Sequence, residues 1–172
     1  GLVIADVSGK GVPAALLMSA FRASLLSQAL GGEAPGVLLE RLNRFLHRSV
    51  ESGRFVTAFL GLLDPATGRL HYSNAGHNPP VICADAGADA PRELSTGGFM
   101  LGAFADGIWE SAEVVLNPGD LLVLYTDGVT EAQDPTGDFW GEERLNAFLA
   151  QHRALGCAEL AAALIQRVRE FE

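Results

Sequence analysis

The sequence predicts an α+β fold in which helices flank a central run of antiparallel strands. Two observations lead to this prediction. Apolar residues recur at helical spacing over residues 12–50 and again over residues 142–171. Between these stretches, short apolar or alternating runs are separated by turns rich in Gly, Pro, Asn and Asp, as in antiparallel sheets. No repeat or long linker divides the chain, so we expect one domain.

The N-terminal third is predicted to be a strand followed by two helices. Residues 2–5 are an apolar run with the branching of a buried strand, which we expect to end at Asp6, and this strand begins so early that the chain looks cut at residue 1. Residues 12–30 have the pattern of an amphipathic helix that ends at Gly31-Gly32. Residues 35–50 have the pattern of a second helix, and we expect the two to pack as a hairpin.

The central part is predicted to be strands and the C-terminal part helices. Residues 55–63 and 69–74 should pair across the turn at 64–68. The remaining strands are expected at residues 81–83, 109–116 and 121–125, the last one buried, with a loop at 84–91. Helices are expected at residues 142–150 and 157–171, where the chain stops.

The composition is that of a domain with a sizeable core. Of 172 residues 48% are hydrophobic, and a chain of this length hides about 70% of its extended surface on folding. The 12 basic and 21 acidic residues give a net charge of −9, with the acids dispersed along the chain. We therefore expect cations as ligands and no nucleic acid as a partner, because DNA and RNA are polyanions.

The cysteines and the hydropathy indicate the compartment. Cys83 and Cys157 lie far apart, with no Cys or His at metal-ligand spacing, which favours free thiols in a reducing cytoplasm over a disulfide framework. No apolar run approaches the roughly 18 residues that cross a bilayer. The sequence thus predicts a cytoplasmic protein and no membrane contact from this chain.

Asp6 is the most informative residue, because it stands between the strand at 2–6 and a glycine-containing turn. Asp127 stands in the same setting, after an apolar strand and before Gly128. An acid at a strand end can simply cap the turn or helix that follows. Two such acids, each beside a loop open to a metal and a substrate, favour a hard-cation site made of carboxylates, main-chain carbonyls and water.

Three sequence blocks resemble a known family. They are DVSGKGVPAAL at residues 6–16, NAGHNPP at 74–80 and YTDGVTEA at 125–132, with a weaker block at 139–145. In order and spacing they are similar to the RsbU/SpoIIE branch of the metal-dependent serine/threonine phosphatases, relatives of the phosphatase 2C group. The resemblance covers nearly all of the chain and implies a four-layer α/β/β/α sandwich of two antiparallel sheets flanked by helices.

The resemblance also implies a chemistry. In this family two Mn²⁺ or Mg²⁺ ions hold a bridging water, which attacks the phosphorus of a phosphoserine or phosphothreonine. By resemblance Asp6 bridges both ions, the backbone carbonyl of Val7 completes one coordination shell, and Asp127 binds the other ion. Gly128 would leave room for the substrate.

The chain departs from the family pattern at two points. The family supplies further metal-binding acids from a block upstream of the first strand and from a block near the C-terminus, and neither block is present. We therefore expect residues 1–172 to be a single phosphatase 2C-like catalytic domain that lacks its first strands and its last strand. Such a chain should be weakly active or inactive on its own.

His77 and Glu131 each have two candidate roles. His77 could protonate the leaving oxygen, but a lone histidine in a turn more often holds its loop through ring hydrogen bonds, which is the role we favour. Glu131 could cap its loop or orient a metal-bound water, and the sequence does not separate these roles.

The resemblance implies a substrate and a mode of control. The substrate would be a phosphorylated protein, an anti-sigma-factor antagonist of the STAS fold, in a bacterial stress or developmental switch. An upstream sensor or receiver domain would act through the two helices after Asp6, and the protein would be a homodimer. The alternative is a non-catalytic interaction module that keeps the fold and binds its partner without hydrolysis.

Overall fold

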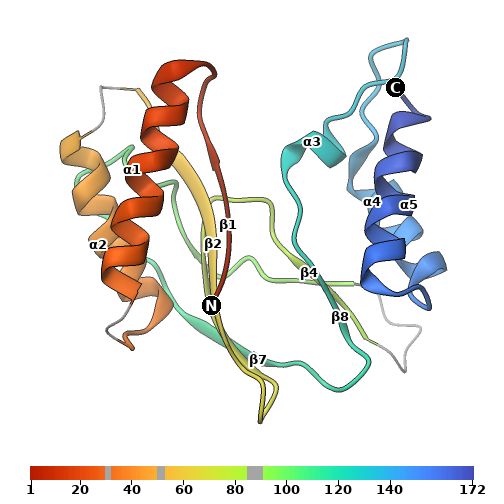
Figure 1. Cartoon of the computed structure of the whole chain (residues 1–172), viewed down its shortest axis with the longest axis horizontal. Helices are drawn as coiled ribbons and strands as arrows, with labels where there is room; N and C mark the ends of the chain where they lie inside the picture. The colour runs from red at the N-terminus through yellow and green to blue at the C-terminus, as the bar shows by residue number, and fades with distance from the viewer. Residues whose placement is uncertain (30–31, 50–52, 85–90) are drawn as a thin grey trace. The chain divides into compact units, whose positions relative to one another are not determined.

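The chain forms two compact units in the computed structural model, which describes residues 1–29, 32–49, 53–84 and 91–172. Unit 1 comprises Gly1–Pro79 and Leu94–Leu116, and unit 2 comprises Pro80–Glu93 and Asn117–Glu172. Each unit has its own sheet, helices and hydrophobic core, and Figure 1 shows the course of the chain through them.

Unit 1 is built on a five-stranded sheet. Its antiparallel centre is formed by β1 (Leu2–Val7), β2 (Val56–Asp64) and β3 (Arg69–Ala75), in that order. β3 also pairs with β7 (Ala112–Val115) in the antiparallel sense and with β6 (Gly97–Gly98) in the parallel sense. The register places Asp6 of β1 directly opposite Thr57 of β2.

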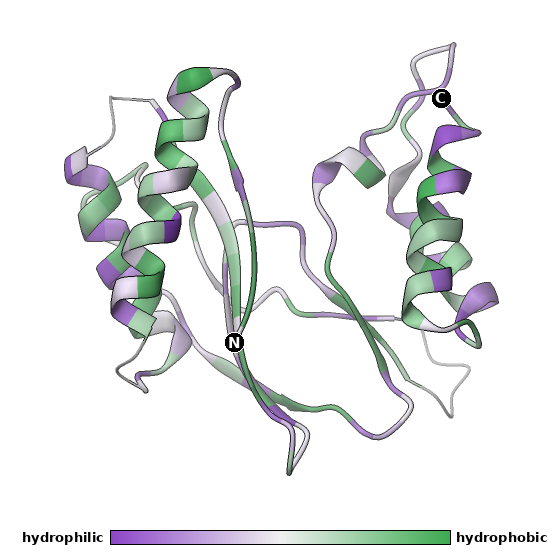
Figure 2. Ribbon diagram, in the orientation of Figure 1, coloured by the Kyte–Doolittle hydropathy of each residue, from purple (hydrophilic) through white to green (hydrophobic). Residues whose placement is uncertain are grey.

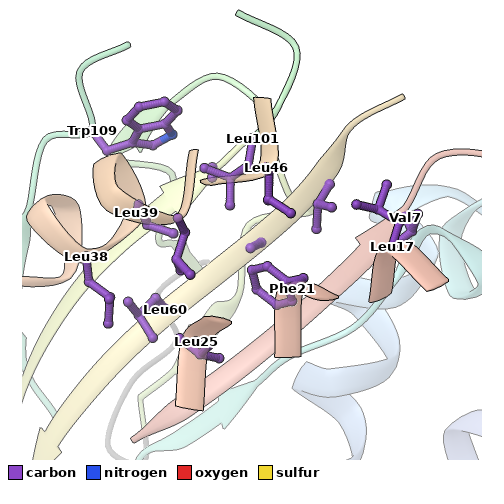
Figure 3. Packing of buried hydrophobic residues seen from close by; sticks show 14 residues of the cluster. Val7, Leu17, Phe21, Leu25, Leu38, Leu39, Leu46, Leu60, Leu101 and Trp109 are labelled. Carbon is purple, nitrogen blue, oxygen red and sulfur yellow. The ribbon is translucent and has the colours of Figure 1, made fainter. Parts of the chain in front are cut away.

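Two helices, α1 (Val12–Gln28) and α2 (Pro35–Ser49), pack on this sheet. Pro13 stands in the first turn of α1, where the missing N–H costs no hydrogen bond. Figure 3 shows the apolar side chains that fill the space between the helices and the strands. They include Leu17, Phe21 and Leu25 of α1, Leu38, Leu39, Leu42 and Leu46 of α2, and Val7, Val56, Ala58 and Leu60 of the strands.

The predicted elements of unit 1 are confirmed with small shifts at their ends, and two predictions need correction. The strand expected at 109–116 begins only at Ala112, because the backbone of Glu110 is bonded elsewhere: its N–H donates to the carbonyl of Gly97 (3.4 Å) and its carbonyl accepts from Oγ of Ser73 (2.8 Å). β6 was not predicted, because two glycines usually indicate a turn. Here glycine permits close approach, since a Cβ on Gly97 would lie 1.8 Å from the carbonyl oxygen of Asn74. The helix ends expected at Leu30-Gly31 and Val50 fall outside the described residues.

Unit 2 combines a three-stranded antiparallel sheet with helices. The strand order is β5 (Arg92–Glu93), β4 (Val81–Cys83) and β8 (Leu121–Val123). The helices are α3 (Asp127–Thr130), α4 (Gly141–His152) and α5 (Cys157–Arg169). The core lies between the sheet and the two longer helices, and consists of Val81, Cys83, Tyr125, Ala132, Trp140, Leu145, Phe148, Leu149, Leu160, Leu164 and Val168.

Unit 2 differs from the prediction at its short elements. The strand expected at 121–125 ends at Val123 and is half-buried, because β8 lies at the edge of its sheet in the described part of the chain. The single helical turn α3 and the two-residue strand β5 carry too few residues to show a period. Most of the loop expected at 84–91 lies outside the described residues. No helix among the described residues is long and apolar enough to span a bilayer.

Candidate active site

Asp6 lies near the end of β1, with its side chain exposed. Ala5 and Val7 pack in the core below α1, so Asp6 shares the opposite face of the sheet with its partner Thr57. The turn after Asp6 is fixed by Ser8, whose N–H donates to the carbonyl of Phe55 (3.0 Å) and whose Oγ accepts from the N–H of Phe55 (2.8 Å). Asp6 is thus presented at a defined strand end.

The backbone carbonyl of Val7 faces away from β2. Val7 is opposite Val56, but Val56 donates its N–H to the carbonyl of Leu101 (2.9 Å) and accepts from the N–H of Leu101 (2.8 Å). Val7 and Val56 therefore form a pair without mutual hydrogen bonds. Within the described residues β1 pairs with β2 alone, so this carbonyl oxygen lies at a sheet edge beside Asp6.

His77 is buried in the turn that follows β3, with 4% of its surface exposed. Its Nδ1 forms a 3.0 Å hydrogen bond with Oγ1 of Thr57, the residue opposite Asp6. Its backbone N–H donates to Oδ1 of Asn74 (2.8 Å), and the Asn74 amide donates to the carbonyl of His77 (3.0 Å). In unit 1, Thr57 therefore links the two residues: it lies opposite Asp6 in the sheet and forms a hydrogen bond with the ring of His77.

Asp127 lies in unit 2, at the start of α3. It lines a pocket of about 450 Å³ together with Gly128, Glu131 and the chain's last residue, Glu172. The carboxylates of Asp127 and Glu131 are exposed, and the N–H of Glu131 donates to the carbonyl of Asp127 (2.7 Å). Three acidic residues therefore line one open pocket of unit 2.

Tyr125 stands two residues before Asp127 and is buried in the core of unit 2. Burial, together with the negative charges of Glu142 and Glu93, raises the pKa of its phenol to about 12. The phenol is therefore neutral at physiological pH. It adds no charge to the acidic pocket that follows it.

Sequence reasoning missed Thr57, Asn74 and Glu172 as members of these two arrangements. Asn74 lies within the NAGHNPP block and could have been singled out with His77. Thr57 carries no sequence signal, since its link to Asp6 depends on the β1–β2 register. Glu172 belongs to no motif and lines the pocket only because of the path of the chain after α5.

The donor chemistry at both places suits a hard cation. Asp6 and Val7 offer a carboxylate and a carbonyl, and the pocket of unit 2 offers carboxylates, so all of these ligands are oxygen atoms, as Mg²⁺ and Mn²⁺ prefer. Over the described ranges, no three His, Cys, Asp or Glu side chains are grouped so that they could hold a metal ion by themselves. The chemical type of these residues suits the ion, but the described residues supply too few ligands at one place to hold it.

Known proteins share this arrangement of elements. The chain is 31% identical over 159 residues to the phosphoserine phosphatase RsbU of Bacillus subtilis, a match that covers 92% of this chain and 47% of RsbU. The SiaA-PP2C domain of Pseudomonas aeruginosa has a TM-score of 0.84 at 24% identity, over 98% of this chain and 68% of that one. The catalytic domain of the serine/threonine phosphatase PstP, solved with 2 manganese ions, has a TM-score of 0.70 at 16% identity, over 96% and 79%.

These likenesses confirm the predicted α+β fold with two sheets and flanking helices. The chain spans about half the length of RsbU. The model of the family described as Stage II sporulation protein E (SpoIIE) matches residues 1–172, and this match agrees with the three blocks that begin at Asp6, Asn74 and Tyr125. The chain therefore belongs to the SpoIIE family, within the RsbU/SpoIIE type of phosphatase 2C-like proteins.

Proposed function

We propose that this chain is the catalytic core of a metal-dependent phosphatase that removes phosphate from phosphoserine or phosphothreonine on a protein. One observation carries the proposal: a SpoIIE-family chain presents oxygen atoms suited to a metal at the end of β1, where Asp6 and Val7 lie, and at the start of α3, where Asp127 lies. RsbU, a relative that matches over most of this chain, is named as a phosphoserine phosphatase. We further propose that units 1 and 2 belong to a single catalytic domain.

Asp6, the carbonyl of Val7 and Asp127 are the proposed ligands of two Mn²⁺ or Mg²⁺ ions. When bound, divalent ions offset the charge of the phosphate and lower the pKa of a nucleophilic water. The exposure of both carboxylates and the edge position of the Val7 carbonyl support these roles. The PstP structure with manganese supports the choice of metal.

Three further residues have proposed roles beside these ligands. His77 positions its turn through Thr57, a role supported by its burial and its ring hydrogen bond. Gly128, without a side chain, leaves the mouth of the acidic pocket open to a phosphorylated side chain. Glu131 stands in the same pocket and would orient water there.

The proposed control acts through α1. Val7 packs in the same core cluster as Leu17 and Phe21 of α1, so a shift of this helix would be felt at the strand end that carries Asp6 (Figure 3). The other side of α1 exposes Val12 (72%) and Leu16 (67%), an apolar surface suited to an upstream sensor domain or to the second subunit of a homodimer.

The proposed substrate is a phosphorylated anti-sigma-factor antagonist of the STAS fold, in the cytoplasm of a bacterium. Support for a phosphorylated substrate comes from the likeness to RsbU, which is named as a phosphoserine phosphatase. Support for a reducing compartment comes from the free thiols of Cys83 and Cys157.

The test is hydrolysis of p-nitrophenyl phosphate by the full-length protein with Mn²⁺ and with EDTA. We expect turnover that requires the metal, and a loss of at least about 100-fold in kcat in Asp6→Asn and in Asp127→Asn. The control is Asp106→Asn, which removes the same charge from an exposed loop of unit 1 and should keep full activity. Turnover that persists in EDTA would eliminate the metal-dependent reaction.

The rival function is binding without hydrolysis. It draws support from the absence, among the described residues, of a three-residue metal group. A full-length protein that binds a phosphoserine peptide yet releases no phosphate under any metal condition would establish this rival and overturn the phosphatase.

A further inference from the structure

The outer side of α2 carries a basic face that the proposed function does not use. Arg41, Arg44 and Arg48 recur at spacings of three and four residues, so they share one side of the helix. The buried leucines of α2 occupy the opposite side. Figure 2 shows polar residues along α2, in contrast to the mostly apolar α1.

These arginines line a groove. Its volume is about 410 Å³, and among the described residues it is also lined by Gln28 at the end of α1 and by Phe45 and Ser49 of α2. Phe45 is 41% exposed, although it is a large apolar side chain on a helix with a well-formed buried face. The groove therefore joins cationic groups to an accessible aromatic ring.

Among the described residues, few acidic groups compensate the charge of the arginines in this groove. Arg41 is paired with Glu33, with 2.6 Å between Nη1 and Oε2. Arg44 and Arg48 form no ion pair within the part of the chain that the structure describes, and the described lining contains no acidic side chain. A chain of net charge −9 thus places 3 of its 12 basic residues along one groove.

Arginine side chains beside an exposed aromatic ring favour a ligand that carries both carboxylates and an apolar group. Guanidinium groups bind carboxylates through paired hydrogen bonds, and an aromatic face accepts an apolar side chain. DNA and RNA fit less well, because the strongly negative chain repels an extended polyanion outside the groove. A free anion would use the arginines and leave the exposed ring of Phe45 without a contact.

We propose that the groove between α2 and the end of α1 docks an acidic segment of a partner protein. Carboxylates of this segment pair with Arg44 and Arg48, and an apolar side chain of the same segment packs on Phe45. The docking surface lies entirely within unit 1 and does not depend on the phosphatase proposal.

Fluorescence anisotropy with a labelled synthetic peptide of repeating Glu-Glu-Leu tests this proposal at low ionic strength. We expect binding that weakens as salt is added, and a loss of about tenfold or more in affinity in the double variant Arg44→Glu/Arg48→Glu. Phe45→Ala should lower the affinity about threefold or more. The matched control is Arg167→Glu/Arg169→Glu on α5, which changes the net charge equally and should stay within about twofold of the parent.

Three outcomes would overturn the docking site. One is an equal loss of affinity in the α5 control, which would reveal attraction to the whole chain. Another is an unchanged affinity in Phe45→Ala, which would leave only an anion site. The third is tighter binding of a duplex DNA oligonucleotide than of the peptide. Circular dichroism and a thermal melt verify folding, and Arg44→Gln/Arg48→Gln replaces the charge reversal if that variant unfolds, with a loss in affinity expected in the same direction.

Discussion

At the scale of single residues, burial separates the two cysteines. Cys83 is buried in β4, whereas Cys157 is exposed at the start of α5. Burial raises the pKa of the Cys83 thiol, and the nearby charge of Arg153 opposes this only in part. Because the thiolate is the reactive form, we expect iodoacetamide to modify Cys157 first and Cys83 only after unfolding. Mass spectrometry of Cys83→Ser and Cys157→Ser assigns the modified residue.

The same thiol contributes to the pH dependence of stability. Its pKa in the folded chain lies above the unfolded value, so its contribution is complete below the unfolded pKa and is lost as the pH rises through the folded pKa. The parent chain should therefore lose stability under alkaline conditions more steeply than Cys83→Ala. Urea unfolding at neutral and alkaline pH measures the two slopes, and equal slopes would contradict the assignment.

The sequence predicted which residues stand at strand ends better than it predicted which residues lie beside them in the folded chain. The apolar run before Asp6 indicates that a strand ends there, and in the structure Asp6 is the last residue but one of β1. The partnership of Thr57 with Asp6 and His77 depends on register and on a turn between separate strands, which no local pattern encodes. Glu172 joins the pocket of Asp127 through tertiary structure alone.

At the scale of elements, Asn43 of α2 ties the helix to the segment at residues 102–105. Its side chain is 1% exposed, and its amide donates to the carbonyls of Phe104 (3.0 Å) and Ala105 (3.3 Å). Its Oδ1 accepts from the N–H of Gly102 (2.7 Å). Asn43→Ala leaves these backbone groups without their partner, so we expect it to lower the free energy of unfolding by about 2–3 kcal/mol.

Tryptophan fluorescence can measure this loss in unit 1. The chain has two tryptophans, Trp109 in unit 1 and Trp140 in unit 2, so a Trp140→Phe background leaves Trp109 as the reporter. The control is Asn146→Ala on α4, a half-exposed position where we expect a change within about 0.5 kcal/mol. If the urea concentration at the midpoint of unfolding is the same for Asn43→Ala and the parent, the hydrogen bonds of Asn43 do not stabilise unit 1 as expected.

Element prediction succeeded where a period is long enough to be read. α1, α2, α4 and α5 each span at least three turns, and β2 and β3 form a hairpin around a turn with clear signals. β5, β6 and α3 have two, two and four residues, which is too short for any hydrophobic pattern. β6 in particular depends on glycine as a spacer between strands, a role that local sequence does not distinguish from a turn.

At the scale of the whole molecule, the proposed oxygen ligands are divided between the two units. Asp6 and Val7 belong to unit 1, whereas Asp127 belongs to unit 2, where Glu131 and Glu172 line the same pocket. Over the described residues neither unit gathers three acidic, histidine or cysteine side chains that could hold an ion. A hard cation needs about six oxygen ligands. Where fewer are present, the negative charges of neighbouring carboxylates repel one another without enough compensation from a bound ion.

We therefore expect the 172-residue chain to bind Mn²⁺ weakly, with a dissociation constant on the order of 1 mM or above. Titration calorimetry at neutral pH measures this, with Asp127→Asn beside Asp138→Asn, an exposed acid of unit 2 outside the pocket of Asp127. The residual heat should fall in Asp127→Asn and persist in Asp138→Asn, because only the former removes a ligand. Tight stoichiometric binding would mean that the chain already supplies enough ligands for the ion, whereas equal heats in both variants would mean that the ion binds to diffuse surface charge.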